Sequence, residues 1–110
     1  MQEERRLIIK MDNAQKYFQE AKKIIDKNKR YIIKSEKVYD LKEGKTDTYL
    51  STIIPYTRTY LNEVFKARRN IDKTTAIKIL EPICKESVKM KDMYEKNGID
   101  YVINYFFKEL

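Results

Sequence analysis

The chain has 110 residues, which is the length of one domain, and it carries a net charge of +7. Hydrophobic residues make up 42% of the chain and charged residues 37%, which argues against full disorder and against a membrane protein. Two Gly and two Pro are too few for a turn-rich β sandwich, so long regular elements are expected.

The N-terminal residues show no targeting signal and one clear helical pattern. The sequence MQEERRLIIKM has only three consecutive apolar residues, too few for a signal peptide, and no run in the chain approaches the roughly 20 residues of a membrane span. Apolar side chains then recur at steps of three and four, at Met11, Ala14, Phe18, Ala21 and Ile25. This pattern predicts an amphipathic helix that begins either at Asp12 or as early as Glu3.

Residues 26–46 fit two structures. Ile25, Ile32 and Tyr39 keep a seven-residue step, which favours a helix that continues to about Leu41. The sequences RYIIK and KVYDL are also rich in β-formers, so a short β hairpin within residues 30–45 is the alternative. We favour the helix, and Gly44 marks where it ends.

Residues 47–69 carry a helical stripe that a proline interrupts. The apolar positions from Tyr49 to Ala67 share one face, and Pro55 falls between them. Proline inside a helix removes one hydrogen bond and clashes with the preceding turn. The sequence therefore predicts either a kinked helix or a helix that starts around Pro55, with Thr52 as its cap.

The last forty residues predict two more helices. Asp72 caps a long helix that carries a kink at Pro82 and ends at the turn signal Asn97-Gly98. Asp100 then caps a short final helix through residues 101–110. The predicted fold is all-α, a four- or five-helix bundle with Pro-kinked helices, in a single domain over residues 1–110.

The residue inventory argues against catalysis and against a cofactor. The chain has no histidine, one cysteine and no glycine-rich loop, which removes His-based catalysis, zinc or iron–sulfur clusters and phosphate loops. The pairs Glu81/Glu86 and Asp92/Glu95 lie between the apolar stripes, so they are expected outside the core and not in a metal site. Cys84 lies on an apolar face and is expected to be a buried structural thiol. We therefore predict no catalytic, cofactor-binding or metal-binding residues.

The positive charge gathers in two clusters that are candidates for binding phosphates. The cluster KNKRYIIK interleaves cations with Tyr31, a side chain that can stack on an unpaired base, and FKARRNIDKTT places cations around a break between two helices. Cations at a helix C-terminus also complement its dipole without any ligand, and Lys-rich faces also serve solubility. The candidate nucleic-acid-binding residues are Lys27, Lys29, Arg30, Lys66, Arg68, Arg69 and Lys73.

Two functions from different classes remain open on the sequence alone. Nine Tyr and four Phe are many for this length, and aromatic residues are favoured at protein interfaces. The first hypothesis is a non-enzymatic, cytoplasmic interaction protein. It either self-associates into a homo-oligomer or joins a larger assembly through a protein partner. The alternative is a basic accessory protein that binds nucleic acid through its Lys and Arg clusters.

Overall fold

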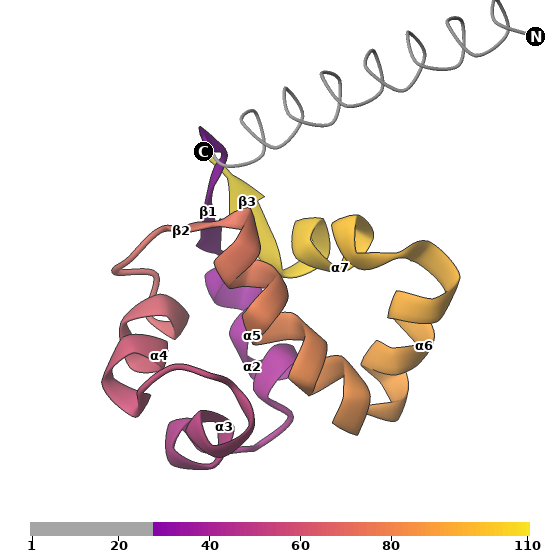
Figure 1. The fold of residues 1–110 in the computed structure, drawn as a ribbon, viewed down its shortest axis with the longest axis horizontal. Coiled ribbons are helices and arrows are strands. Elements are labelled where there is room, and N and C mark those ends of the chain that lie inside the picture. Colours follow the sequence, from indigo (N-terminus) through magenta and orange to yellow (C-terminus); the bar gives the residue numbers. More distant parts are fainter. Residues whose placement is uncertain (1–27) are drawn as a thin grey trace, which may run out of the picture.

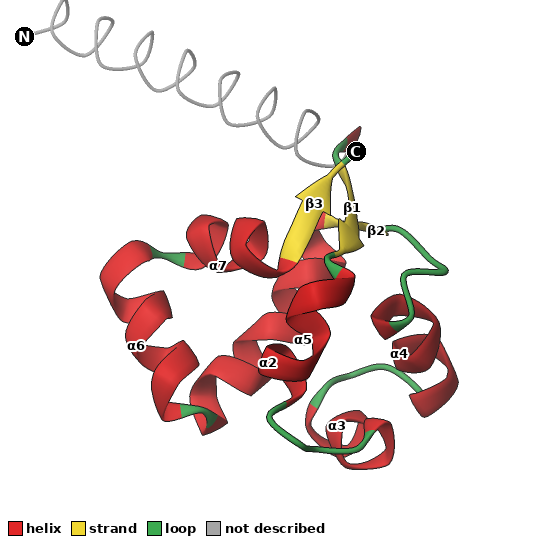
Figure 2. Cartoon of the chain, turned by 180° about the vertical axis from the view of Figure 1, so that it is seen from behind, coloured by secondary structure: helices red, strands yellow, loops and turns green. Residues whose placement is uncertain are grey.

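The computed structural model of the chain describes residues 28–110, so Lys27 and the amphipathic helix expected at residues 11–25 lie outside the described part. This part is mostly helical and includes a small antiparallel sheet (Figures 1 and 2). Its α-helices are α2 (Val38–Lys42), α3 (Asp47–Ile53), α4 (Arg58–Phe65), α5 (Lys73–Glu86), α6 (Val88–Asn97) and α7 (Ile99–Phe106). Its strands are β1 (Arg30–Ile33), β2 (Ile71–Asp72) and β3 (Phe107–Glu109), and a 3-10 turn, η1, spans Ser35–Lys37.

The sheet joins three segments that are far apart in the sequence. β1 lies between β2 and β3, antiparallel to both, with Tyr31 opposite Ile71 and Ile33 opposite Phe107. Tyr31 and Ile33 are buried, as the alternation of a strand requires. The helix favoured for residues 26–41 is therefore wrong at β1. The alternative is right that RYIIK forms a strand. It is wrong that this strand makes a hairpin with KVYDL, because β1 pairs with distant residues and Val38–Leu41 belong to the helix α2.

Pro55 separates two helices instead of kinking one. The residue before it, Ile54, is extended, with φ −102° and ψ 136°, as the clash with the proline ring favours. α3 therefore ends at Ile53 and α4 begins at Arg58. The cap of α4 is Thr57, whose hydroxyl accepts the backbone N–H of Tyr60 at 3.2 Å, and the cap expected at Thr52 is wrong.

The long helix expected after residue 72 is two helices. Asp72 caps α5 as predicted, since its carboxylate accepts the backbone N–H of Thr75 at 2.7 Å. Pro82 lies inside α5, but the chain becomes extended at Ser87, which caps α6 by accepting the N–H of Met90 at 3.2 Å. α6 ends at the predicted turn, where Gly98 has a φ of +83°.

The final helix is shorter than the sequence predicts. α7 begins directly after Gly98, so Asp100 lies in its first turn and not at its cap. The helix ends at Phe106, and residues 107–109 continue as β3. Phe106 and Phe107 are both buried, at 1% exposure, and the change from helix to strand lets two consecutive aromatic side chains enter the core.

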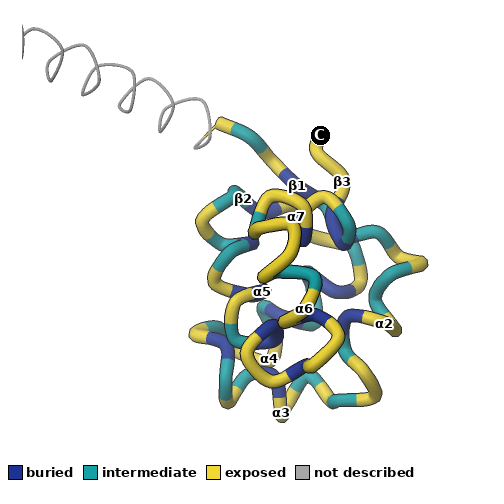
Figure 3. Tube along the Cα trace, turned by 90° about the vertical axis from the view of Figure 1, so that its right-hand side faces the viewer, coloured by how far each residue is buried: buried dark blue, intermediate teal, exposed yellow. Residues whose placement is uncertain are grey.

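The described helices pack around α5. Figure 1 shows α3 and α4 on one side of α5 and α6 and α7 on the other, with the sheet at one end. The buried side chains of α5 are Ala76, Ile79, Leu80, Ile83 and Cys84. In Figure 3 the buried positions of the surrounding elements line the inside of this arrangement. The helical class is confirmed. The expected four- or five-helix bundle is not, because the structure also contains a three-stranded sheet that joins both ends of the described residues.

Truncating Phe107 is expected to destabilise the protein by about 3–5 kcal/mol, because the Phe107→Ala change empties a buried aromatic site. Urea unfolding followed by circular dichroism measures the effect. The control is Tyr39→Ala at a side chain that is 82% exposed, which is expected to change stability by less than about 0.5 kcal/mol. Equal effects of the two changes would contradict the burial of Phe107.

The charge of Asp72 is expected to make folding sensitive to acid. Hydrogen bonds from the hydroxyl and then the backbone N–H of Thr75 lower the pKa of Asp72 below its usual value. A lowered folded-state pKa gives stability that is present at neutral pH and is lost as the pH falls below about 5. Asp72→Asn keeps a good cap, so unfolding midpoints across this pH range should fall less steeply for the variant than for the wild type. The exposed control Glu95→Gln should follow the wild type.

Candidate nucleic-acid interface

Three of the candidate cations are held by protein groups at the sheet. Lys29 Nζ lies 3.8 Å from a carboxylate oxygen of Glu109, and Lys73 Nζ lies 3.0 Å from one of Asp100. Arg30 donates from Nε to the side-chain oxygen of Asn70 at 2.8 Å and from Nη2 to the Asn70 carbonyl at 3.1 Å. These contacts tie the neighbouring strands and α7 together, so we assign Lys29, Arg30 and Lys73 mainly to the fold.

The first basic cluster does not offer an aromatic face to a base. Tyr31 is 4% exposed and belongs to the core. Its Cα partners in the sheet are Ile71 on one side and Glu109 on the other. The prediction that Tyr31 stacks on an unpaired base is therefore wrong, because a central strand turns this ring inward.

The other three candidates lie exposed where α4 ends. Lys66 is the C-terminal cap of α4, and the next residue, Ala67, has a left-handed φ of +58°. This conformation turns the chain sharply, and the backbone N–H of Arg68 returns to the carbonyl of Glu63 at 3.0 Å. Arg68 and Arg69 consequently lie beside the helix that precedes them.

These cations are weakly neutralised. The nearest contact between Arg68 and Glu63 is 3.9 Å, and both side chains are more than a third exposed, so the pair contributes little. Arg69 places its guanidinium over the ring of Tyr60, 4.9 Å from the ring centre. Among residues 28–110, neither Lys66 nor Arg69 forms an ion pair with a carboxylate.

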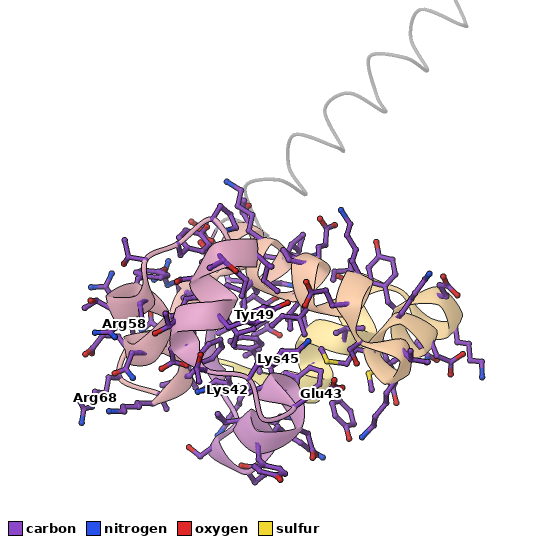
Figure 4. The ribbon with its side chains drawn as sticks, turned by 90° about the horizontal axis from the view of Figure 1, so that it is seen from below. Lys42, Glu43, Lys45, Tyr49, Arg58 and Arg68 are labelled. Atoms are coloured by element: carbon purple, nitrogen blue, oxygen red, sulfur yellow. The ribbon has the colours of Figure 1, made fainter. Side chains whose placement is uncertain are left out.

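Arg58 joins these residues, although the sequence clusters do not include it. It is the first residue of α4, is exposed, and forms no ion pair within the described part of the chain. Figure 4 shows Arg58 and Arg68 projecting at the same end of the molecule. Its signal in the sequence is an isolated cation between aromatic residues, in YTRTY, which a search for runs of charge overlooks. We call Arg58, Lys66, Arg68 and Arg69 the α4 cationic patch.

Two tyrosines adjoin the patch. The rings of Tyr56 and Tyr60 are stacked, with centres 4.9 Å apart and planes inclined by 29°. Both rings are half-buried and pack against the core. Beside them is an open hollow of about 630 Å³ lined by Ser51, Ile54, Pro55, Tyr56, Thr57, Arg58 and Tyr60.

Two lysines, one at the end of α2 and one in the connection to α3, have closer carboxylate partners than the cations of the α4 cationic patch. Lys42 lies 2.6 Å from a carboxylate oxygen of Asp47, and Lys45 lies 3.2 Å from one of Glu86. The hydroxyl of Tyr49 also donates to Glu86 at 2.8 Å, and these two donors, Tyr49 first, lower the pKa of that carboxyl. Figure 4 shows Lys42, Lys45 and Tyr49 nearer the middle of the molecule than Arg58 and Arg68. The two lysines are paired with carboxylates, although Asp47 also lines a hollow with Arg58.

The remaining reactive side chains serve the fold. Cys84 is buried, and burial together with the charge of Glu81 raises the pKa of its thiol to about 11, which is unsuited to a nucleophile. Glu86 is engaged by Tyr49 and Lys45. Within residues 28–110, no cluster of three or more acidic or cysteine side chains is placed to hold a metal ion.

Comparisons of the chain with protein-family models, curated proteins and solved structures found no match. Among the described helices, none has the length and apolar character that crossing a bilayer requires.

Proposed function

We propose that this chain is a non-enzymatic, cytoplasmic protein that binds nucleic acid through the α4 cationic patch. The observation that supports it is a concentration of cations of which only Arg68 has a carboxylate partner in the described part of the chain. Residues 58–69 contain four cations and one carboxylate, Glu63, whose contact with Arg68 is long. Like charges held together on one surface repel one another, and a polyanion relieves that repulsion.

The cation type suits phosphate. All four arginines of residues 28–110 lie in the patch or next to it, because Arg30 is bonded to Asn70, which follows Arg69. The planar guanidinium group donates two parallel hydrogen bonds to a phosphate, whereas Lys offers a strongly hydrated point charge. A surface built only for solubility has no need of this preference.

The helix dipole accounts for only part of the patch. Lys66, Arg68 and Arg69 lie at the C-terminal end of α4, where the dipole favours a cation. Arg58 lies at the opposite end, where a cation is disfavoured. Helix stability therefore does not explain a cation at position 58, whereas contact with a bound anion would explain it.

Binding is expected to be strongly salt-dependent. Three to four phosphate contacts on a single strand predict that the affinity falls roughly 20- to 50-fold between about 50 and 200 mM salt. The reason is that binding releases counterions from the phosphates, and this release is less favourable at higher salt. Fluorescence anisotropy with a labelled oligonucleotide measures the slope. Arg58→Gln should weaken binding and reduce the slope of log affinity against log salt by about 0.7.

The matched control is Lys89→Gln, which removes the same charge from an exposed position on α6. It should leave the affinity close to that of the wild type. Failure of the wild type to bind any oligonucleotide at low salt would end the proposal. An equal effect of Arg58→Gln and Lys89→Gln would place binding outside the α4 cationic patch.

The second candidate function is self-association or entry into a larger protein assembly. It is favoured by large apolar side chains left in solvent, namely Val88 at 87%, Tyr39 at 82% and Leu110 at 65% exposure. Apolar side chains of this kind gain free energy when a partner covers them.

Sedimentation of the wild type at high micromolar concentration should then show a dimer or larger species. Val88→Asp should shift this equilibrium toward the monomer, because the change puts a charge into the contact. Val88 is the first residue of α6, where Asp is compatible with the helix. A monomer at every concentration would remove the support for self-association.

A further inference from the structure

Resting on the proposed function, we infer that the α4 surface selects unpaired strands, because an unpaired base stacks on the tier formed by Tyr56, Tyr60 and Arg69. By tier we mean a stack of flat groups, made of the two tyrosine rings and the guanidinium group of Arg69. The tyrosine rings stack with centres 4.9 Å apart, and the Arg69 guanidinium lies 4.9 Å from the centre of the Tyr60 ring. A planar guanidinium and an aromatic ring both present flat faces of the kind on which nucleobases stack.

The tier is organised before a ligand arrives. Tyr56 and Tyr60 both pack against the core, and Tyr60 lies in the first turn of α4, where its backbone N–H donates to the Thr57 cap. Side chains that are already held lose little conformational freedom on binding. A surface tyrosine on a mobile loop would gain less from the same stacking contact.

The surroundings place phosphate-binding groups next to the flat faces. Arg58 lines the open hollow together with Tyr56 and Tyr60, so a cation and two aromatic rings border one space. The hollow is shallow and widely open to solvent, so a base could approach the rings that border it. The arrangement pairs an aromatic platform with a cationic rim, as sequence-tolerant single-strand binding requires.

A duplex cannot use this tier in the same way. Its bases are stacked on one another, so their faces are closed to a protein ring. The cationic patch would still attract the duplex phosphates, and the proposed function would then hold without selectivity. An acidic protein segment would also be attracted to the α4 cationic patch, but it has no bases that could stack on the rings.

The experiment compares ligands that share phosphates and differ in their bases. Anisotropy titrations use a labelled single strand of about 15 nucleotides, a blunt duplex of the same sequence, and an abasic strand of the same length. Labelled polyglutamate tests whether an acidic protein segment binds the α4 cationic patch instead of nucleic acid. We expect the single strand to bind roughly tenfold or more tightly than the other three, the effect of at least one stacked base.

Variants of Tyr56 test the ring itself, since Tyr56 lies outside the helices. Tyr56→Leu should lower the single-strand affinity at least about fivefold and leave duplex binding unchanged, while Tyr56→Phe should retain the wild-type preference. Circular dichroism checks that each variant is folded, and the abasic comparison needs no variant.

The outcomes separate the two proposals. Equal binding of the single strand, duplex and abasic strand would overturn the stacking inference and leave nucleic-acid binding intact. Tighter binding of polyglutamate than of the single strand would overturn both in favour of an acidic protein partner. No binding of any oligonucleotide at low salt would also overturn both.

Discussion

The pairing of β1 with two distant strands is the constraint on which the rest of the structure depends. It brings residues near 30, 71 and 107 into one sheet and buries Tyr31, Ile33, Ile71 and Phe107 together. β2 lies between α4 and α5 in the sequence and is followed at once by α5, so the position of β2 fixes where α5 begins. The position of Arg68 and Arg69 follows from this, because they have only Asn70 between them and the sheet.

The charge of the folded chain is distributed differently from the charge of the sequence. The cations near the sheet and in the α2–α3 connection are matched by carboxylates or amides, as Lys29, Lys45 and Lys73 show. In the described part of the chain, the cations of the α4 cationic patch have few carboxylate contacts. Arg68 lies 3.9 Å from Glu63, and Arg58 lines a hollow with Asp47 without an ion pair. Part of the positive charge of residues 28–110 is therefore held in structural contacts, and the arginines of the α4 cationic patch are among the cations that are held less tightly.

Some local signals predicted local structure, although the caps expected at Thr52 and Asp100 were wrong. The cap at Asp72, the turn at Asn97-Gly98 and the burial of Cys84 each depend on residues within a few positions, and all three are confirmed. The sheet was missed because its pairings join residues that no short window contains. Arg58 was missed because it stands alone in the sequence, whereas in the folded chain it projects at the same end of the molecule as Arg68 (Figure 4). The binding roles of these residues remain predictions.

The sheet also sets an order for folding during synthesis. β3 lies more than seventy residues after β1, so the sheet cannot be completed until residues 107–109 have left the ribosome. Contacts between such distant segments form slowly, since a long loop must close first. Until then one edge of β1 has no partner strand, and an unpaired edge with apolar neighbours is open to pairing with other chains. The nascent chain is consequently open to such pairing until β3 has emerged.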